Sequence, residues 1–144
     1  MAAAGKGAKA LETILKIMTQ NGGFDRVLQG FKVLEGGAGA CVAEIEVGKE
    51  HLNKGGSLHG GFTATAVDVI STCALMTQGD GVPGVSVDLH VTYLKAARPG
   101  DKVIFDATTI KAGKTLAFLK VDVKDKLNGD IIARGSHTKY IGRK

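Results

Sequence analysis

The stretch from Gly55 to Met76 constrains the fold more than any other, because a glycine-rich turn there runs directly into a long apolar segment. From Phe62 onward the apolar residues leave no wide polar face, which is typical of a helix buried on all sides. A soluble chain can bury such a helix only inside a sheet. Asp68 is the exception in this helix, since a carboxylate is costly to desolvate unless it is paired, hydrogen-bonded or required for function.

The length of 144 residues fits one domain, spanning residues 1–144, with residues 1–7 expected to be flexible. Both cysteines, Cys41 and Cys73, lie in apolar segments, which argues against disulfides and for a reducing compartment. Asp68 and the two hydroxyl residues that follow it interrupt the longest apolar run. We therefore expect a soluble protein without integral membrane association.

The net charge of +5 and the pI near 9.3 favour an anionic partner, which could be nucleic acid, a membrane surface or a phosphorylated small molecule. Tryptophan is absent and aromatic residues make up 5% of the chain, so there is little for nucleic-acid bases to stack on. The basic residues are scattered through the second half of the chain. This distribution predicts a small polyanion rather than nucleic acid.

Leu11, Ile14, Leu15 and Met18 recur at helical spacing and predict an N-terminal surface helix that ends near residues 21–23. Its basic, alanine-rich character is faintly similar to a mitochondrial targeting segment. The segment lacks arginine and contains Glu12, so an ordinary docking helix is favoured.

The rest of the chain is typical of strands. Two strands are expected, one around residues 31–33 and one at 41–47, and four more at residues 85–93, 103–110, 116–123 and 131–140. In the first of these four, Val85 to Tyr93 alternate strictly between apolar and polar residues. The sum is an α+β domain in which an antiparallel sheet curls around one long central helix. Its exposed edges and apolar strands predict a homo-oligomer.

Five segments together resemble the hotdog-fold, PaaI-type acyl-CoA thioesterases: Phe24 to Leu28, Leu58 to Gly61, Gly84 to Asp88, Gly113 to Phe118 and His137 to Lys139. The likeness covers nearly the whole chain. It implies hydrolysis of fatty or aryl acyl-CoA to free acid and coenzyme A. It also implies a dimer of dimers in the cytoplasm or the mitochondrion.

The residues fit this chemistry. Thioester hydrolysis needs a group that stabilises charge on the carbonyl oxygen and a group that activates water. The Gly60 N–H at a helix N-terminus suits the first task. Asp68 is the candidate base or nucleophile, with the Ser86 hydroxyl orienting the water or steadying the carboxylate. The resemblance adds Asn53 as a second contact to the oxygen and His59 as a neighbouring polar group.

Helix geometry makes a further demand. Gly60 and Asp68 are eight residues apart, which is about 12 Å at about 1.5 Å of rise per residue. Within one chain, Gly60 and Asp68 are therefore too far apart to contact the same thioester carbon. Antiparallel helices across a two-fold axis would set Asp68 of one subunit beside Gly60 of the other, as the resemblance also implies.

Each residue has a structural alternative. Asp68 could be a carboxylate satisfied within the core, and His59 could cap the helix. Asn53 could form an Asx turn, Ser86 could be an ordinary residue on a polar strand face, and Gly60 could serve close packing.

The basic residues could hold the phosphates of coenzyme A by charge-assisted hydrogen bonds. By resemblance, the coenzyme contacts fall on Ser86, Tyr93, Leu94, Lys95, Ala96, Ala97, Arg98, Lys111, Ala112, Gly113, Lys114, Thr115, Leu116 and Tyr140. Many relatives have a Pro-Ala pair where this chain has Ala96-Ala97. The exposed lysines and arginine could also be solvated loop cations.

No metal or other cofactor is expected, because His51, His90 and His137 do not form a ligand pattern and the cysteines fit a core. Two other functions stay open. One is a hotdog hydratase or dehydratase, which would use a histidine paired with an acid, and the other is a non-catalytic acyl-CoA-binding module. The preferred acyl chain, a dimer as against a tetramer, and direct attack by Asp68 as against general-base catalysis cannot be derived from the sequence.

Overall fold

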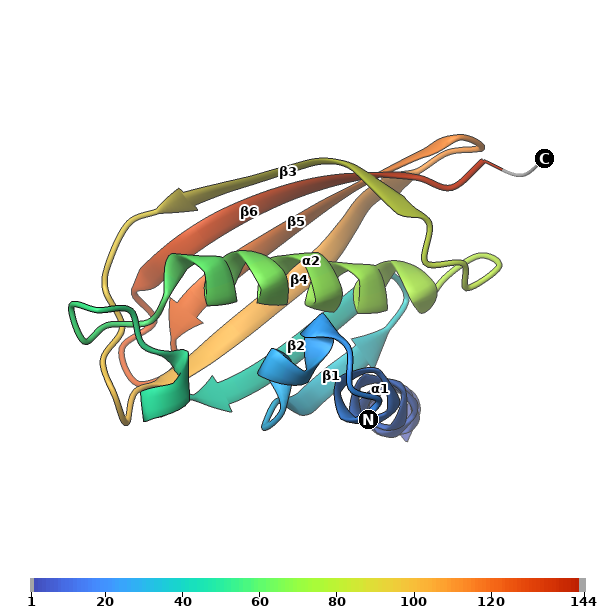
Figure 1. Cartoon of the computed structure of the whole chain (residues 1–144). Helices are drawn as coiled ribbons and strands as arrows, with labels where there is room; N and C mark the ends of the chain where they lie inside the picture. The colour runs from blue at the N-terminus through green and yellow to red at the C-terminus, as the bar shows by residue number, and fades with distance from the viewer. Residues whose placement is uncertain (1, 143–144) are drawn as a thin grey trace.

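The computed structural model describes residues 2–142, with side chains described from residue 7 onward. Within these residues, two helices, two short 3₁₀ helices and six strands follow one another (Figure 1). In order they are α1 (Ala2–Gln20), η1 (Phe24–Leu28), β1 (Lys32–Gly37), β2 (Ala40–Glu46), η2 (Lys49–His51), α2 (Gly60–Met76), β3 (Val85–Tyr93), β4 (Lys102–Ala112), β5 (Leu116–Asp125) and β6 (Ile131–Tyr140).

The six strands form one antiparallel sheet in the order β1-β2-β4-β5-β6-β3, so β1 and β3 are its edges. The sheet curves around α2, which lies along its concave face (Figure 1). The expected α+β architecture is confirmed. The two 3₁₀ helices were not predicted from the sequence, because three to five residues are too few to show a helical period.

α2 is the centre of the core. Ala66, Val67 and Ile70 are fully buried against the sheet, as the absence of a polar face predicted. β6 approaches the helix closely, because a Cβ added at Gly135 would lie 2.5 Å from Val67 Cγ1. Cys41 and Cys73 are free, buried thiols, as expected of core residues.

α1 packs beside the outer strand β1, with Leu11 and Leu15 buried. The contact is close because a Cβ added at Gly36 would lie 2.4 Å from Leu11 Cδ1. This is the arrangement expected of a docking helix. Residues 2–7 have helical backbone and Met1 lies outside the described residues, so the flexibility of residues 1–7 stays a prediction.

β3 departs from the alternation predicted for it. The register of β3 with β6 pairs Ser86 with Lys139 and Asp88 with Thr138, which places a bulge at Val87. A bulge inserts one residue and reverses the side-chain alternation at that point. Ser86 therefore shares the inner sheet face with Lys139, whereas strict alternation would have placed it with Asp88 on the outer face.

Candidate active site

Asp68 is the half-exposed acid of the central helix. The neighbouring Val67 and Val69 are buried, yet 42% of the Asp68 side chain is exposed. Its carboxylate Oδ1 lies 3.8 Å from His137 Nε2, beyond hydrogen-bond distance. Asp68 therefore presents a carboxylate to solvent along an otherwise buried helix. Complete satisfaction within the core, the structural alternative for this residue, does not describe it.

His137 lies directly behind this carboxylate. Its side chain is fully buried on β6, with Nδ1 2.8 Å from Ser71 Oγ and Nε2 2.7 Å from Ser86 Oγ. Burial lowers the pKa of the imidazole below its usual value, against the opposing effect of Asp68. The lowered pKa favours the uncharged ring at neutral pH, and the ring connects the helix to the edge strand.

Lys139 follows on the same face of β6. Its ammonium is buried and donates a 2.7 Å hydrogen bond to Thr72 Oγ1 on α2. Burial lowers the pKa of this amine, although the nearby Asp68 carboxylate acts in the opposite direction. The His137 imidazole and the Lys139 amine thus both lie near the Asp68 carboxylate.

The start of α2 forms a second polar cluster. His59 is the N-cap, and its Nδ1 accepts a 2.8 Å hydrogen bond from the Gly61 N–H. Tyr93 on β3 donates a 2.6 Å hydrogen bond to the Gly60 carbonyl, and a Cβ added at Gly60 would lie 3.3 Å from the Tyr93 ring. Within residues 2–142 the Gly60 N–H donates to no acceptor. It is therefore available to a ligand oxygen.

Asn53 lies in the loop before this helix start. Its side-chain amide donates to Ser57 Oγ at 3.1 Å and its Oδ1 accepts from the Ser57 N–H at 3.1 Å. These bonds close the loop between Asn53 and Ser57, four residues on, whereas the Asx turn given as the structural alternative would bond only two residues on. One Asn53 N–H remains for a ligand, since a carboxamide has two.

The predicted catalytic residues therefore form two groups in one chain. Asp68 and Ser86 both lie next to His137 Nε2, at 3.8 Å and 2.7 Å. Gly60, Asn53 and His59 lie at or near the helix start. Ser86 makes no hydrogen bond to Asp68 in the described part of the chain.

The candidate coenzyme contacts are divided in the same way. Residues 93–98 lie near the start of α2, since Tyr93 bonds to Gly60 and the Ala97 carbonyl accepts from the Leu58 N–H. Lys95 is paired with Asp130, and the Ala97 side chain is buried. Leu94, Ala96 and Arg98 are exposed.

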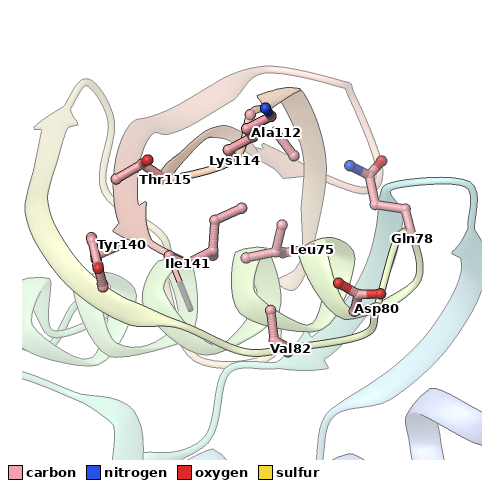
Figure 2. Close-up of a pocket in the computed structure, with 12 residues that line it drawn as sticks. Leu75, Gln78, Asp80, Val82, Ala112, Lys114, Thr115, Tyr140 and Ile141 are labelled. Carbon is pink, nitrogen blue, oxygen red and sulfur yellow. The ribbon is translucent and has the colours of Figure 1, made fainter. Parts of the chain in front are cut away.

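The remaining contacts lie near the opposite end of α2. Residues 112–115 and Tyr140 line a cavity of about 590 Å³ together with Leu75 and Gln78 from the helix end and the following loop. Figure 2 shows Leu75 and Ile141 below the hairpin that carries Lys114 and Thr115. Lys111 and Leu116 flank these residues and are exposed.

His137 and Ser71 were not predicted as site residues from the sequence. His137 belonged to a segment that carried the resemblance but received no role, and Ser71 was noted only as a polar interruption of the helix. They meet across 66 positions of sequence, so no local pattern could indicate the contact. No group of three or more potential metal ligands is found within the described residues.

Comparison with known proteins identifies the family. The model of the thioesterase superfamily matches residues 55–132, which span α2 and the strands up to the start of β6. The chain belongs to the thioesterase superfamily.

Individual thioesterases extend the likeness to most of the chain. Acyl-coenzyme A thioesterase 13 of Mus musculus is 46% identical over 132 residues, which are 92% of this chain and 94% of the relative. The crystal structure of zebra fish thioesterase superfamily member 2 has a TM-score of 0.92 and 47% identity, covering 94% of this chain and 98% of that one. The PaaI-type, hotdog-fold resemblance is thereby confirmed.

A more distant solved structure contains a ligand. The Streptococcus mutans protein smu.793 was solved bound to acetyl CoA, with 26% identity and a TM-score of 0.74 over 81% of this chain and 92% of that one. Among the described residues of the present thioesterase, no helix is long and apolar enough to cross a membrane.

Proposed function

We propose that this thioesterase hydrolyses fatty or aryl acyl-CoA to a free acid and coenzyme A, at a site shared between two subunits. The observation that carries the proposal is the exposed Asp68 carboxylate on a buried helix, about 12 Å along α2 from the unpartnered Gly60 N–H. The relatives named for acyl-coenzyme A, and the one bound to acetyl CoA, support this substrate class.

The edge strand β3 supports a two-fold arrangement. Val85, Val87 and Tyr93 are 63%, 60% and 53% exposed, which is unusual for apolar side chains gathered on one strand. An unpaired edge with such side chains favours pairing with a second copy. Antiparallel β3–β3 pairing would bring the start of α2 in one subunit toward Asp68 in the other.

The same pairing would unite the two groups of coenzyme contacts. Residues 93–98 and residues 111–116 lie at opposite ends of α2, and a two-fold axis across β3 exchanges those ends. Lys111 and Lys114 are exposed and suited to phosphate groups. We extend the proposal to a dimer of dimers, as in the sequence expectation.

In the proposed reaction, Asp68 removes a proton from water while the water oxygen forms a bond to the thioester carbon. The Gly60 N–H and Asn53 of the other subunit stabilise the oxyanion, with His59 holding the helix start in place. The carbon–sulfur bond then breaks, and the proton passes from Asp68 to the departing thiolate. Direct attack by Asp68 would instead expel the thiolate and form an anhydride. Water that opens this anhydride at the Asp68 carbonyl carbon would leave an oxygen atom from labelled water in Asp68 after a single turnover.

A hydratase or dehydratase receives no support from the site. His137 is near an acid but is fully buried, so its ring cannot reach a substrate carbon. The other candidate histidine, His59, has Nδ1 engaged in capping the helix.

A thiol-release assay over acyl-CoA chain lengths, on the wild type and on Asp68→Asn, tests the proposal. Burial raises the pKa of Cys41 to about 12 and of Cys73 to about 11, so the protein's own thiols should not react with the reporter. We expect Asp68→Asn to lose at least about 100-fold in kcat while still binding coenzyme A. Unchanged turnover in this variant would refute the assignment of Asp68, and binding without thiol release by the wild type would indicate a binding module.

A further inference from the structure

A continuous chain of hydrogen bonds links α2 to the edge strand through His137. Ser71 Oγ lies 3.1 Å from the Asp68 carbonyl oxygen and 2.8 Å from His137 Nδ1. The other ring nitrogen, Nε2, lies 2.7 Å from Ser86 Oγ. Three hydrogen bonds must therefore be made with one hydroxyl hydrogen from each serine and one hydrogen from the neutral ring.

The carbonyl fixes the direction of the chain. A carbonyl oxygen only accepts, so the Ser71 hydrogen points to the Asp68 carbonyl and Ser71 Oγ accepts from His137 Nδ1–H. The neutral ring has no second N–H, so Nε2 accepts the hydrogen of Ser86. For a neutral ring, this is the one arrangement that forms all three bonds. Burial, which lowers the pKa of His137, favours the neutral ring that it requires.

This direction of the hydrogen bonds determines what Ser86, which is exposed, can offer to a ligand. With its hydrogen turned inward, Ser86 Oγ offers only lone pairs to a molecule in the site. A water that attacks a carbonyl must give its hydrogens to acceptors, so that an oxygen lone pair faces the carbon. Ser86 Oγ and the Asp68 carboxylate, both next to His137 Nε2, would be two such acceptors. The reverse direction would make Ser86 a donor and occupy the lone pair needed for attack.

We propose that His137 is a positioning residue: held as the Nδ1–H tautomer by Ser71, it turns the Ser86 hydroxyl inward and makes Ser86 Oγ an acceptor for the hydrolytic water. His137 itself does not contact substrate. The role in hydrolysis rests on the proposed function, whereas the tautomer can be measured without any substrate.

The tautomer is tested by long-range ¹H–¹⁵N correlation spectra of histidine-labelled protein near pH 8, with the His137 signals assigned from their loss in His137→Gln. We expect the Nδ1–H pattern in the wild type. Ser71→Ala removes the acceptor of that N–H and should shift His137 toward the Nε2–H form. An Nε2–H pattern in the wild type, or no change in Ser71→Ala, would overturn the proposal.

Kinetics test the connection to Ser86. We expect His137→Leu and Ser86→Ala each to lower kcat about 10- to 100-fold, with KM within about two-fold, and the double variant to stay within about two-fold of Ser86→Ala. Ser136→Ala, on the exposed outer face beside His137, is the matched control and should retain wild-type kinetics. Losses that multiply in the double variant would overturn the proposal.

Should His137→Leu fail to fold, Ser71→Ala combined with Ser86→Ala provides the same cycle, with the same non-additive result expected. Absence of hydrolysis by the wild type would defeat the proposed function, while the tautomer measurement would still decide whether His137 orients Ser86.

Discussion

At the residue scale, small changes at the contact between α2 and β6 carry large consequences. Gly135 allows β6 to approach the helix at Val67, and the adjacent inward residue, His137, is thereby placed within reach of Ser71. The absence of one side chain thus helps to position the site.

We expect Gly135→Ala to lower the free energy of unfolding by about 1–3 kcal/mol, because the new methyl group would lie 2.5 Å from Val67 Cγ1. Urea denaturation measures the loss. Gly23→Ala is the control, since nothing lies within 4 Å of its added Cβ and its φ of −83° suits alanine. In a Val67→Ala background, Gly135→Ala should lower the free energy of unfolding by less. An equal loss in both backgrounds would show that the contact with Val67 does not cause the destabilisation.

His137 gives stability a dependence on pH. Burial lowers its pKa in the folded state, so the unfolded chain binds the proton more readily below the ordinary value of 6.5. The free energy of unfolding should therefore fall as pH decreases from about 7 to about 5.

His137→Gln removes this titration, and its stability should vary less with pH over that range. Asp68, Lys139 and Asp88 are the charged groups that act on His137, and all three are retained in the variant. Urea denaturation at several pH values compares the two proteins. Parallel pH profiles would contradict a depressed pKa at His137.

At the element scale, the sequence predicted the order and type of the main elements because each has a strong period. Val85 to Tyr93 alternate and α2 lacks a polar face, and both became the elements expected. The bulge at Val87 could not be predicted, since it depends on the register with β6. For that reason the alternation alone could not place Ser86, which was named as a candidate beside Asp68, on the inner face, and it gave no indication of the contact with His137.

We expect Val87→Glu, on the exposed edge of β3, to shift the protein from an oligomer to the 14.9 kDa monomer and to lower thiol release at least about ten-fold. Two such glutamates would repel across a β3–β3 pair. Leu127→Glu is the matched control, because Leu127 is 96% exposed in the turn between β5 and β6. Analytical ultracentrifugation reads the mass, and an unchanged mass for Val87→Glu would rule out association through this edge.

At the scale of the whole molecule, one chain holds all the proposed catalytic groups but at separate positions along α2. The separation of Gly60 and Asp68 followed from helical rise alone and was derived from the sequence. The division of the coenzyme contacts between the two ends of α2 needed the structure, because it depends on which hairpins reach each end. Both divisions favour a site completed by a second copy of the chain.

Subunit complementation tests this shared site most directly. Asp68→Asn and Asn53→Ala chains, carrying different affinity tags, are co-expressed and the mixed oligomer is purified through both tags. If Asp68 and Asn53 act from different subunits, each mixed dimer contains one site with both defects and one intact site. We expect thiol release at about half the wild-type rate per mixed dimer, far above either single variant. Activity no greater than that of the two variants alone would contradict a site shared between subunits.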